Sequence, residues 1–195
     1  MRVGVLGLQG DVGEHMDALR RLRANPVWVK DLATLESVRA LIIPGGESTT
    51  ISDLLIDNGL FEPVRKRAIA GMPVFGTCAG AILLAKDAGL QQRQSGQKLL
   101  GLMDMSVDRN AFGRQKESFE ADVPVNGVGK MRVPFIRAPV ISKVWGKCEP
   151  IARLDGKIVA ARQGNFLAAC FHPEISGDDR LHEFFIRKFL SNTAH

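Results

Sequence analysis

Residues 72–85 read MPVFGTCAGAILLA, and this stretch decides the fold class. A short apolar run ends in the pattern Gly-x-Cys-x-Gly over residues 76–80, and helix-forming residues follow. A nucleophile flanked by glycines at a sharp strand-to-helix turn is a nucleophile elbow, where larger side chains would clash. The pattern predicts a strand over 72–77, a helix over 79–85 and a reactive thiol at Cys78. Taken alone, Cys78 also fits a small core residue after a strand.

The rest of the chain continues this alternation and then changes character. Apolar runs predict strands at 2–8, 27–29 and 40–43, and helical spacing predicts helices at 10–24, 48–55 and 61–70. From 99 to about 170 the periods are strand-like, with a hairpin turn at Asp155-Gly156, and an amphipathic helix follows at 179–190. We therefore expect one domain over residues 1–195. Its fold would be three-layer α/β, with a mostly parallel central sheet flanked by helices and extra antiparallel strands in the C-terminal half.

The composition excludes several functional classes. The 195 residues are 45% hydrophobic and 24% charged, as in an ordinary globular protein. No apolar run approaches the roughly 20 residues of a membrane helix, and the first run is too short for a signal peptide, so we expect a cytoplasmic protein. Three cysteines without metal-ligand spacing argue against a disulfide framework and against a metal site. The net charge of +5 comes from short clusters in helical patterns, so no nucleic-acid partner is expected.

A second segment at a strand end can supply a base. Phe171-His172-Pro173-Glu174 follows the apolar run 166–170. His172 can take the proton of a thiol and later return it to a leaving amine. Glu174 lies two residues further on and can hold the imidazole in one tautomer. A lone histidine is more often structural, but paired with the elbow this segment predicts a triad of Cys78, His172 and Glu174.

A third segment, Pro44-Gly45-Gly46-Glu47-Ser48, lies between a predicted strand and a predicted helix. Two glycines allow backbone N–H groups to approach a ligand closely, and such a nest can hold a developing oxyanion. A plain turn with Ser48 as the helix N-cap is the alternative interpretation, and the two are compatible.

Together these segments resemble the class I, or triad-type, glutamine amidotransferases, whose fold is flavodoxin-like. Further motifs are similar to those of one branch, the glutaminase subunits of pyridoxal 5′-phosphate synthase, and residues 88–100 match none of them. The matching motifs keep the same order from residue 4 to residue 174: Gly7-Leu8-Gln9-Gly10 with Glu14-His15, Pro44 to Thr50, Gly76 to Gly80, Arg109 to Gln115, Phe135 to Pro139 and Phe171 to Glu174.

The resemblance implies a reaction and its partners. L-Glutamine would be hydrolysed to L-glutamate and ammonia through a thioester on Cys78. The ammonia would pass to a synthase subunit with a (β/α)8 barrel, which makes pyridoxal 5′-phosphate within a large ring-shaped complex. No cofactor motif is present in this chain, because the dinucleotide and P-loop patterns are both absent.

The resemblance also implies residue roles. The backbone N–H groups of Gly46 and Ala79 are the candidates for the oxyanion hole. Either arginine of the set could clamp the α-carboxylate of glutamine. The implied glutamine-binding residues are Gly46, Glu47, Ser48, Arg109, Ile136 and Arg137.

Other interpretations stay open at this point. A glutaminase of imidazole-glycerol-phosphate synthase would keep the triad, although the motif at 109–115 argues against it. Cysteine peptidases and stress proteins of similar fold place the histidine close after the elbow, whereas here it follows 94 residues later. A non-catalytic subunit with a decayed site conflicts with the complete triad.

Two expectations concern the partner. We expect the Gly45-Gly46 segment not to be fully set for catalysis without the synthase, because glycines change conformation cheaply. The helix over 10–24, with Gln9 and His15, is either a docking surface or an ordinary covering helix.

Overall fold

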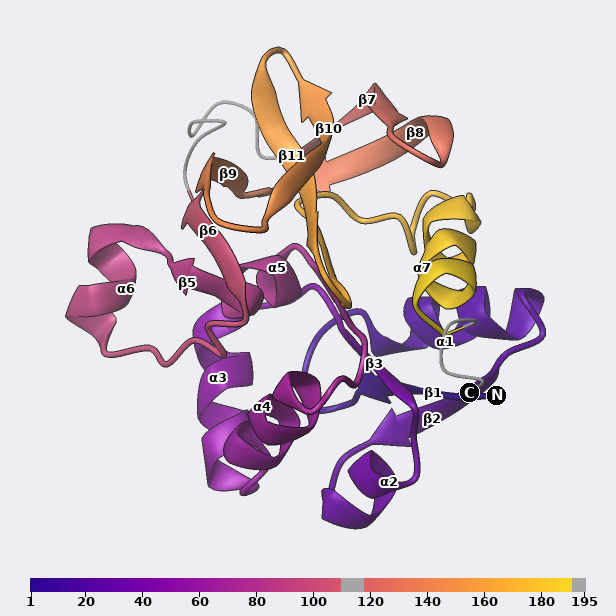
Figure 1. Ribbon diagram of the computed structural model, residues 1–195, viewed down its shortest axis with the longest axis vertical. Helices are drawn as coiled ribbons and strands as arrows, with labels where there is room; N and C mark the ends of the chain where they lie inside the picture. The colour runs from indigo at the N-terminus through magenta and orange to yellow at the C-terminus, as the bar shows by residue number, and fades with distance from the viewer. Residues whose placement is uncertain (110–117, 191–195) are drawn as a thin grey trace.

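Five parallel strands form the first part of the sheet in the computed structural model, which describes residues 1–109 and 118–190 (Figure 1). Their order is β2-β1-β3-β4-β12, as in flavodoxin-like folds, and the order reverses between β1 and β3. Ligands of such folds bind beyond the carboxyl ends of the strands at this reversal. The bounds are β1 Arg2–Leu6, β2 Asn25–Val29, β3 Ala40–Ile43, β4 Val74–Thr77 and β12 Phe166–Ala169.

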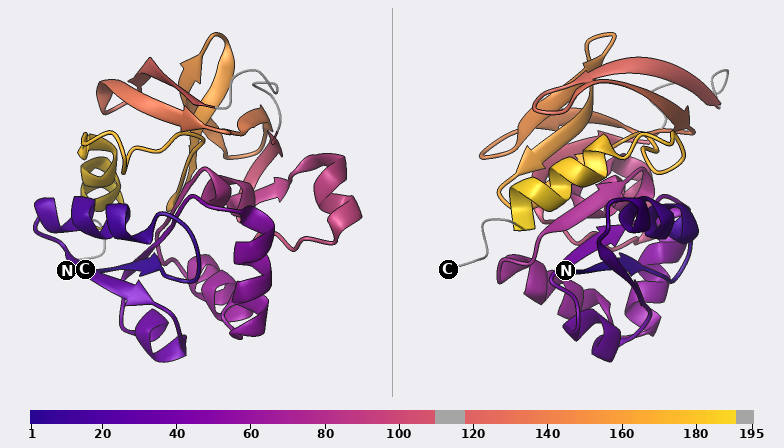
Figure 2. Two further views of the ribbon diagram at one scale, coloured as in Figure 1. Left: turned by 180° about the vertical axis from the view of Figure 1, so that it is seen from behind. Right: turned by 90° about the vertical axis from the view of Figure 1, so that its right-hand side faces the viewer.

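The remaining strands extend the sheet mainly by antiparallel pairing, as expected for the C-terminal half. β12 pairs with β11, followed by β10, β7 and β8, while β9 joins β11 to β6 and β6 pairs in parallel with β5. β7 to β11 lie at the top of Figure 1 and curl over the rest of the chain in Figure 2, whereas β5 and β6 lie beside α5 and α6. The bounds are β5 Ala85–Asp87, β6 Met103–Asp108, β7 Ser118–Val125, β8 Gly129–Ile136, β9 Val140–Val144, β10 Glu149–Leu154 and β11 Lys157–Gln163.

Helices cover both faces of the parallel strands. α1 and α7 lie side by side on one face, joined by the ion pair between Arg21 and Asp179, and α3, α4 and α5 lie on the other (Figures 1 and 2). No helix in the described part of the chain is long and apolar enough to cross a membrane. The bounds are α1 Val12–Arg21, α2 Leu32–Glu36, α3 Ser48–Asp57, α4 Phe61–Ile69, α5 Ala79–Leu84, α6 Gly89–Ser95 and α7 Arg180–Leu190.

The burial of the strands follows from these layers. All four residues of β3 and of β4 are buried, because helices cover the sheet on both sides. β7 instead alternates between exposed and less exposed residues along most of its length, because one face of the antiparallel part meets water. The predicted turn at Asp155-Gly156 connects β10 to β11, which pair as a hairpin.

Four elements differ from the predictions. α1 spans Val12–Arg21 and is shorter than the predicted 10–24, because Gly10 has a positive φ of 106° that no α-helix accommodates. α2 was not predicted, although Asp31 and Thr34 form a capping box at its start. β5 and α6 also follow α5 in a segment for which the sequence predicted no regular structure.

Candidate active site

Cys78 occupies the sharp turn between β4 and α5. Its φ of 47° and ψ of −102° are unusual for a residue with a side chain, and such strain is typical of functional sites. Both flanking glycines are required because any side chain at these positions would clash with the backbone. A Cβ on Gly80 would lie 2.1 Å from the carbonyl oxygen of Ile43, and one on Gly76 would lie 2.5 Å from that of Gly80. The backbone N–H of Cys78 donates to Ala169 on β12 at 2.8 Å, which ties the elbow to the neighbouring strand.

His172 lies beyond the end of β12, where it meets the elbow. It is 4% exposed and lines the same cleft as Cys78. Its Nδ1 lies 2.7 Å from Oε1 of Glu174, which is itself buried. The backbone N–H of His172 donates to Pro134 on β8 at 3.0 Å and fixes the segment against the antiparallel part. The structure thus brings together nucleophile, base and carboxylate from two halves of the chain.

Asp11 is a second carboxylate on the same imidazole. Its Oδ2 lies 3.3 Å from Nδ1 of His172, and its side chain is 35% exposed. Burial disfavours the charged imidazolium, but hydrogen bonds with Asp11, Cys78 and Glu174 outweigh burial and raise the pKa of His172 to about 12. His172 is therefore an imidazolium at neutral pH. In this form it can pair with a thiolate and can protonate a leaving group.

The loop after β3 is held against the loop after β1. The N–H of Asp11 donates to the carbonyl of Gly45 at 3.1 Å, and the N–H of Glu47 donates to Oε1 of Gln9 at 2.9 Å. A Cβ on Gly45 would lie 2.4 Å from Cε1 of His172, so only glycine fits there without displacing the imidazole. Gly46 has a φ of 149°, which also favours glycine.

The N-cap of α3 is Glu47, not Ser48. The carboxylate of Glu47 accepts from the N–H groups of Thr49 and Thr50 at 3.1 and 2.6 Å. Burial opposes its ionisation, but these hydrogen bonds prevail and lower the pKa of Glu47. The prediction of Ser48 as N-cap was wrong because the longer carboxylate, one residue earlier, reaches both N–H groups.

An open cleft of about 530 Å³ extends from Cys78 and His172 along these loops. All predicted glutamine-binding residues line it: Gly46, Glu47, Ser48, Arg109, Ile136 and Arg137. Ala79 and Glu174 are not part of its surface; Ala79 is buried in α5, and Glu174 lies behind His172.

Arg109 enters the cleft from the end of β6. Its guanidinium donates to the hydroxyl of Ser48 and to Oε1 of Gln97, and burial lowers its pKa. Arg137 follows β8 with a φ of 42°, a strained backbone at the rim of the cleft. The remainder of the predicted motif, Asn110 to Gln115, lies outside the described residues.

Several lining residues were not predicted to belong to the site. Gln9 and Asp11 follow β1, so the rule that carboxyl ends of parallel strands meet at one edge could have located them. Gln91 comes from the segment without a recognisable motif, and nothing in the sequence pointed to it. The residues in this group are Gln9, Asp11, Ile82, Gln91 and Ile175.

The triad region also contains atoms that metals bind. One ligand atom each from Asp11, His172 and Glu174 lies within 4.8 Å of the others. Nδ1 of His172 and Oε1 of Glu174 are already engaged with one another, which suits proton transfer by this pair.

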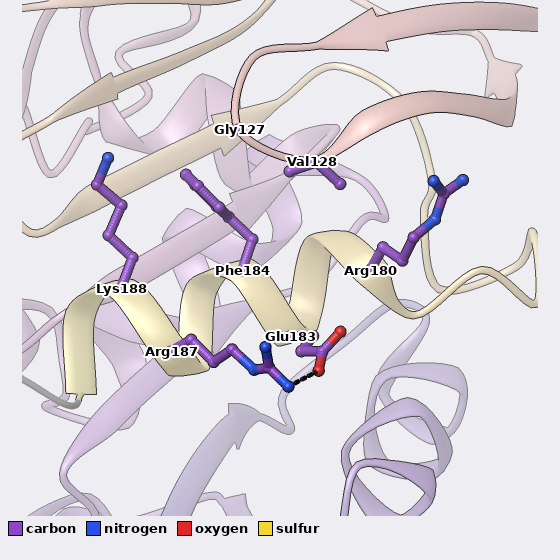
Figure 3. Close-up of a pocket in the computed structure, with 7 residues that line it drawn as sticks. All are labelled: Gly127, Val128, Arg180, Glu183, Phe184, Arg187 and Lys188. Carbon is purple, nitrogen blue, oxygen red and sulfur yellow. Dashed lines mark ion pairs between the residues drawn. The ribbon is translucent and has the colours of Figure 1, made fainter.

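A separate hollow of about 330 Å³ lies between α7 and the turn that joins β7 to β8 (Figure 3). Its charged residues are largely paired, Arg187 with Glu183 at 2.6 Å and Arg180 with Asp178. No predicted site residue lines it, so it offers no chemistry related to Cys78.

Comparisons with known proteins agree on one family. The model of the SNO glutamine amidotransferase family matches residues 5–191. Two relatives are named pyridoxal 5′-phosphate synthase subunit PdxT. The one from Pelotomaculum thermopropionicum is 56% identical, covering 96% of this chain and 95% of its own. The one from Hyperthermus butylicus is 53% identical, covering 94% and 95%.

Solved structures share the fold. A crystal structure of a glutamine amidotransferase has a TM-score of 0.90 and 48% identity, covering 95% of this chain and 97% of its own. The structure of PurLQS from Thermotoga maritima has a TM-score of 0.68 at 16% identity, covering 96% and 97%, and shows likeness of fold alone.

Proposed function

The chain belongs to the SNO glutamine amidotransferase family and is a glutaminase subunit of pyridoxal 5′-phosphate synthase, and from this premise we propose that Cys78, His172 and Glu174 hydrolyse its glutamine. The observation that carries the assignment is the contact of His172 with Glu174 beside the cleft that Cys78 lines. Nδ1 of His172 lies 2.7 Å from Oε1 of Glu174, and Cys78 and His172 line the same cleft.

In the proposed reaction, the thiolate of Cys78 attacks the side-chain amide carbon of L-glutamine. The resulting oxyanion would be held by the backbone N–H groups of Gly46 and Ala79. Collapse of this intermediate breaks the C–N bond, and the imidazolium of His172 donates the proton with which ammonia leaves. A thioester of glutamate with Cys78 remains.

The second half of the reaction uses the same imidazole as a base. Neutral His172 accepts a proton from water as the water attacks the thioester carbon. The C–S bond breaks and L-glutamate leaves, which restores the thiolate of Cys78 beside the imidazolium of His172. Glu174 stays ionised throughout and holds the imidazole with Nδ1 protonated.

We further propose that the cleft binds glutamine by its charged end. The guanidinium of Arg109 or of Arg137 faces the cleft and suits the α-carboxylate. The hydrogen bond from Arg109 to Ser48 supports its role, because it orders a long cation beside the loop after β3. Glu47, Gly46 and Ile136 complete the proposed contacts.

The partner follows from the names of the relatives. We propose that this chain docks on a (β/α)8-barrel synthase subunit within a ring-shaped complex, and that residues 1–195 act there as one cytoplasmic glutaminase domain. His15 does not contribute to such docking, since it is 0% exposed. Coupling to the partner would involve Gly45-Gly46. The carbonyl of Gly45 accepts from the N–H of Asp11 in the loop after β1, and glycines can change backbone conformation at low cost.

Glutamine hydrolysis by the chain alone and with the synthase tests both proposals. We expect Cys78→Ala to abolish hydrolysis in the complex, and retained hydrolysis would overturn the triad. We expect the unmodified chain to hydrolyse glutamine faster with the synthase than without it. Equal rates would reject the coupling while leaving the triad standing.

A further inference from the structure

A buried pair of histidines lies directly behind the triad. His15 on α1 and His182 on α7 are both 0% exposed, and Nδ1 of His15 lies 2.8 Å from Nε2 of His182. The other nitrogen of His15, Nε2, lies 3.0 Å from the hydroxyl of Thr77, the residue before the nucleophile. It also lies 3.6 Å from Oε2 of Glu174. His15 therefore touches the elbow and faces the triad carboxylate at once.

Both histidines are neutral. Burial and the neighbouring His182 and His172 hold the pKa of His15 well below its usual range. Burial lowers the pKa of His182 to about 4. A neutral imidazole carries a single N–H, so the hydrogen bond between them leaves two possible arrangements.

In the first arrangement, Nδ1 of His15 donates to His182. The proton of His182 then sits on its Nδ1, which has no hydrogen-bond partner among the described residues. Nε2 of His15 would accept from the hydroxyl of Thr77, but its lone pair would also face the carboxylate of Glu174. A buried N–H without an acceptor and a lone pair facing an anion are both unfavourable.

In the second arrangement, Nε2 of His182 donates to Nδ1 of His15. The proton of His15 then sits on Nε2, where it is shared between Thr77 and Glu174. Oε2 of Glu174 lacks any closer hydrogen-bond partner within the described ranges, so this N–H meets its one unsatisfied oxygen. The distance of 3.6 Å is long for a hydrogen bond, but contacts of catalytic groups commonly tighten when substrate binds.

We propose that His15 is a positioning residue of the triad: its Nε2–H is directed at Glu174 and keeps that carboxylate ionised and aligned on His172, while His182 fixes the tautomer of His15. This inference rests on the proposed function of the triad. The other ionisable groups around Glu174 are His172 at 2.7 Å and Asp11, and Cys78 reaches it only through His172.

The proposal predicts a shift in pH dependence. Without the N–H of His15, Glu174 would take up a proton at higher pH, and a protonated Glu174 no longer supports the imidazolium of His172. The acidic limb of the pH profile of kcat/KM would therefore move to higher pH. KM for glutamine should stay unchanged, because His15 does not line the cleft.

The experiment compares His15→Leu, which has no donor, with His15→Gln, whose side-chain N–H can take the place of Nε2–H. Both are assayed for glutamine hydrolysis in the complex with synthase across the pH range. We expect His15→Leu to lower kcat about tenfold and to shift the acidic limb upward, and His15→Gln to restore most of both. Alkylation of Cys78 by iodoacetamide against pH gives a second profile that needs no glutamine.

Phe75→Leu is the matched control for packing. The ring of Phe75 lies against both histidines, with centroids 6.4 and 5.6 Å away, but takes no part in the hydrogen bonds. It should lower the melting temperature without moving the acidic limb. A His15→Leu profile that keeps the wild-type acidic limb, or an equal loss in His15→Gln, would overturn the proposal. A wild-type complex that hydrolyses no glutamine would overturn the proposed function, and this inference with it.

Discussion

Oδ2 of Asp11 lies 3.3 Å from Nδ1 of His172, so the catalytic imidazole faces two carboxylates, one buried and one at the surface of the cleft. Glu174 is closer, at 2.7 Å, and is shielded from water. The side chain of Asp11 is 35% exposed, so water reaches its carboxylate. His172 therefore has one buried carboxylate partner and one that is in contact with water.

Asp11→Asn should lower the pKa of His172 and, with it, the contribution of His172 to the free energy of unfolding. The folded-state pKa, raised to about 12, lies above the ordinary value of 6.5. The stabilising contribution is therefore complete below about pH 6.5 and is lost as the pH rises toward the folded value. We expect the free energy of unfolding to fall by about 1 kcal/mol, and this difference to stay nearly constant from pH 6 to pH 10, because the folded-state pKa of His172 lies above that range in both proteins.

Chemical denaturation of both proteins at several pH values measures this difference. Asp17→Asn on the exposed side of α1 is the control, since its pair with Arg20 is open to water. A difference for Asp11→Asn that is absent at pH 6, or already lost by pH 8, would contradict the expected link to His172.

Strain at the elbow predicts an order of stabilities. Cys78 has a φ of 47° with a ψ of −102°, a region open to glycine but costly for residues with a Cβ. Cys78→Gly should therefore be more stable than Cys78→Ala by about 1–2 kcal/mol, although both lose the nucleophile. Thermal unfolding compares them directly, and an equal or higher melting temperature for Cys78→Ala would show that the turn is not strained.

Two glycines should respond to alanine in opposite ways. A Cβ on Gly45 would lie 2.4 Å from the imidazole of His172, so Gly45→Ala should displace the base and lower kcat by about 100-fold. Gly13 on α1 is exposed with nothing within 4 Å of its Cβ position. Gly13→Ala should leave kcat unchanged and raise stability by up to about 1 kcal/mol.

Steady-state kinetics and thermal unfolding of both variants test this pair. Wild-type kcat in Gly45→Ala would mean that the loop can move aside without cost.

Arg109→Lys should weaken glutamine binding. A lysine ammonium lacks the planar guanidinium that donates to Ser48 and that is proposed to bind the α-carboxylate of glutamine. KM should therefore rise about tenfold or more while kcat changes less. Arg132→Lys on β8 is the matched control, because its pair with Glu120 is exposed and lies outside the cleft. An unchanged KM in Arg109→Lys would assign the α-carboxylate to Arg137 instead.

The three thiols should differ sharply in reactivity. Cys78 opens into the cleft, whereas burial raises the pKa of Cys170 strongly and, with Asp104 and Glu149, raises that of Cys148 to about 11. Iodoacetamide at about pH 7.5 should attach once per native chain, because only a thiolate reacts. Mass spectrometry counts the adducts, and an adduct that persists in Cys78→Ala would contradict the assignment.

The residues proposed as the triad could be picked out from the sequence because each part carries a local signature. Gly-x-Cys-x-Gly requires a sharp turn whatever surrounds it, and His172 and Glu174 stand two residues apart at a strand end. The resemblance to glutamine amidotransferases adds the residues of the cleft. His15 lay in a quoted motif and Asp11 between its two parts, yet nothing in their spacing told which would face His172 and which would be buried behind it.

The sequence by itself determined the α/β alternation, the elbow and the family, since these depend on short-range patterns of apolar residues and glycines. Only the tertiary structure decided what surrounds the imidazole of His172. The pairing of β4 with β12 brings two segments 94 residues apart within hydrogen-bond distance, and the packing of α1 against α7 buries His15 beside Glu174. Such contacts depend on how whole helices and strands pack against one another, and the local spacing of residues does not predict that packing.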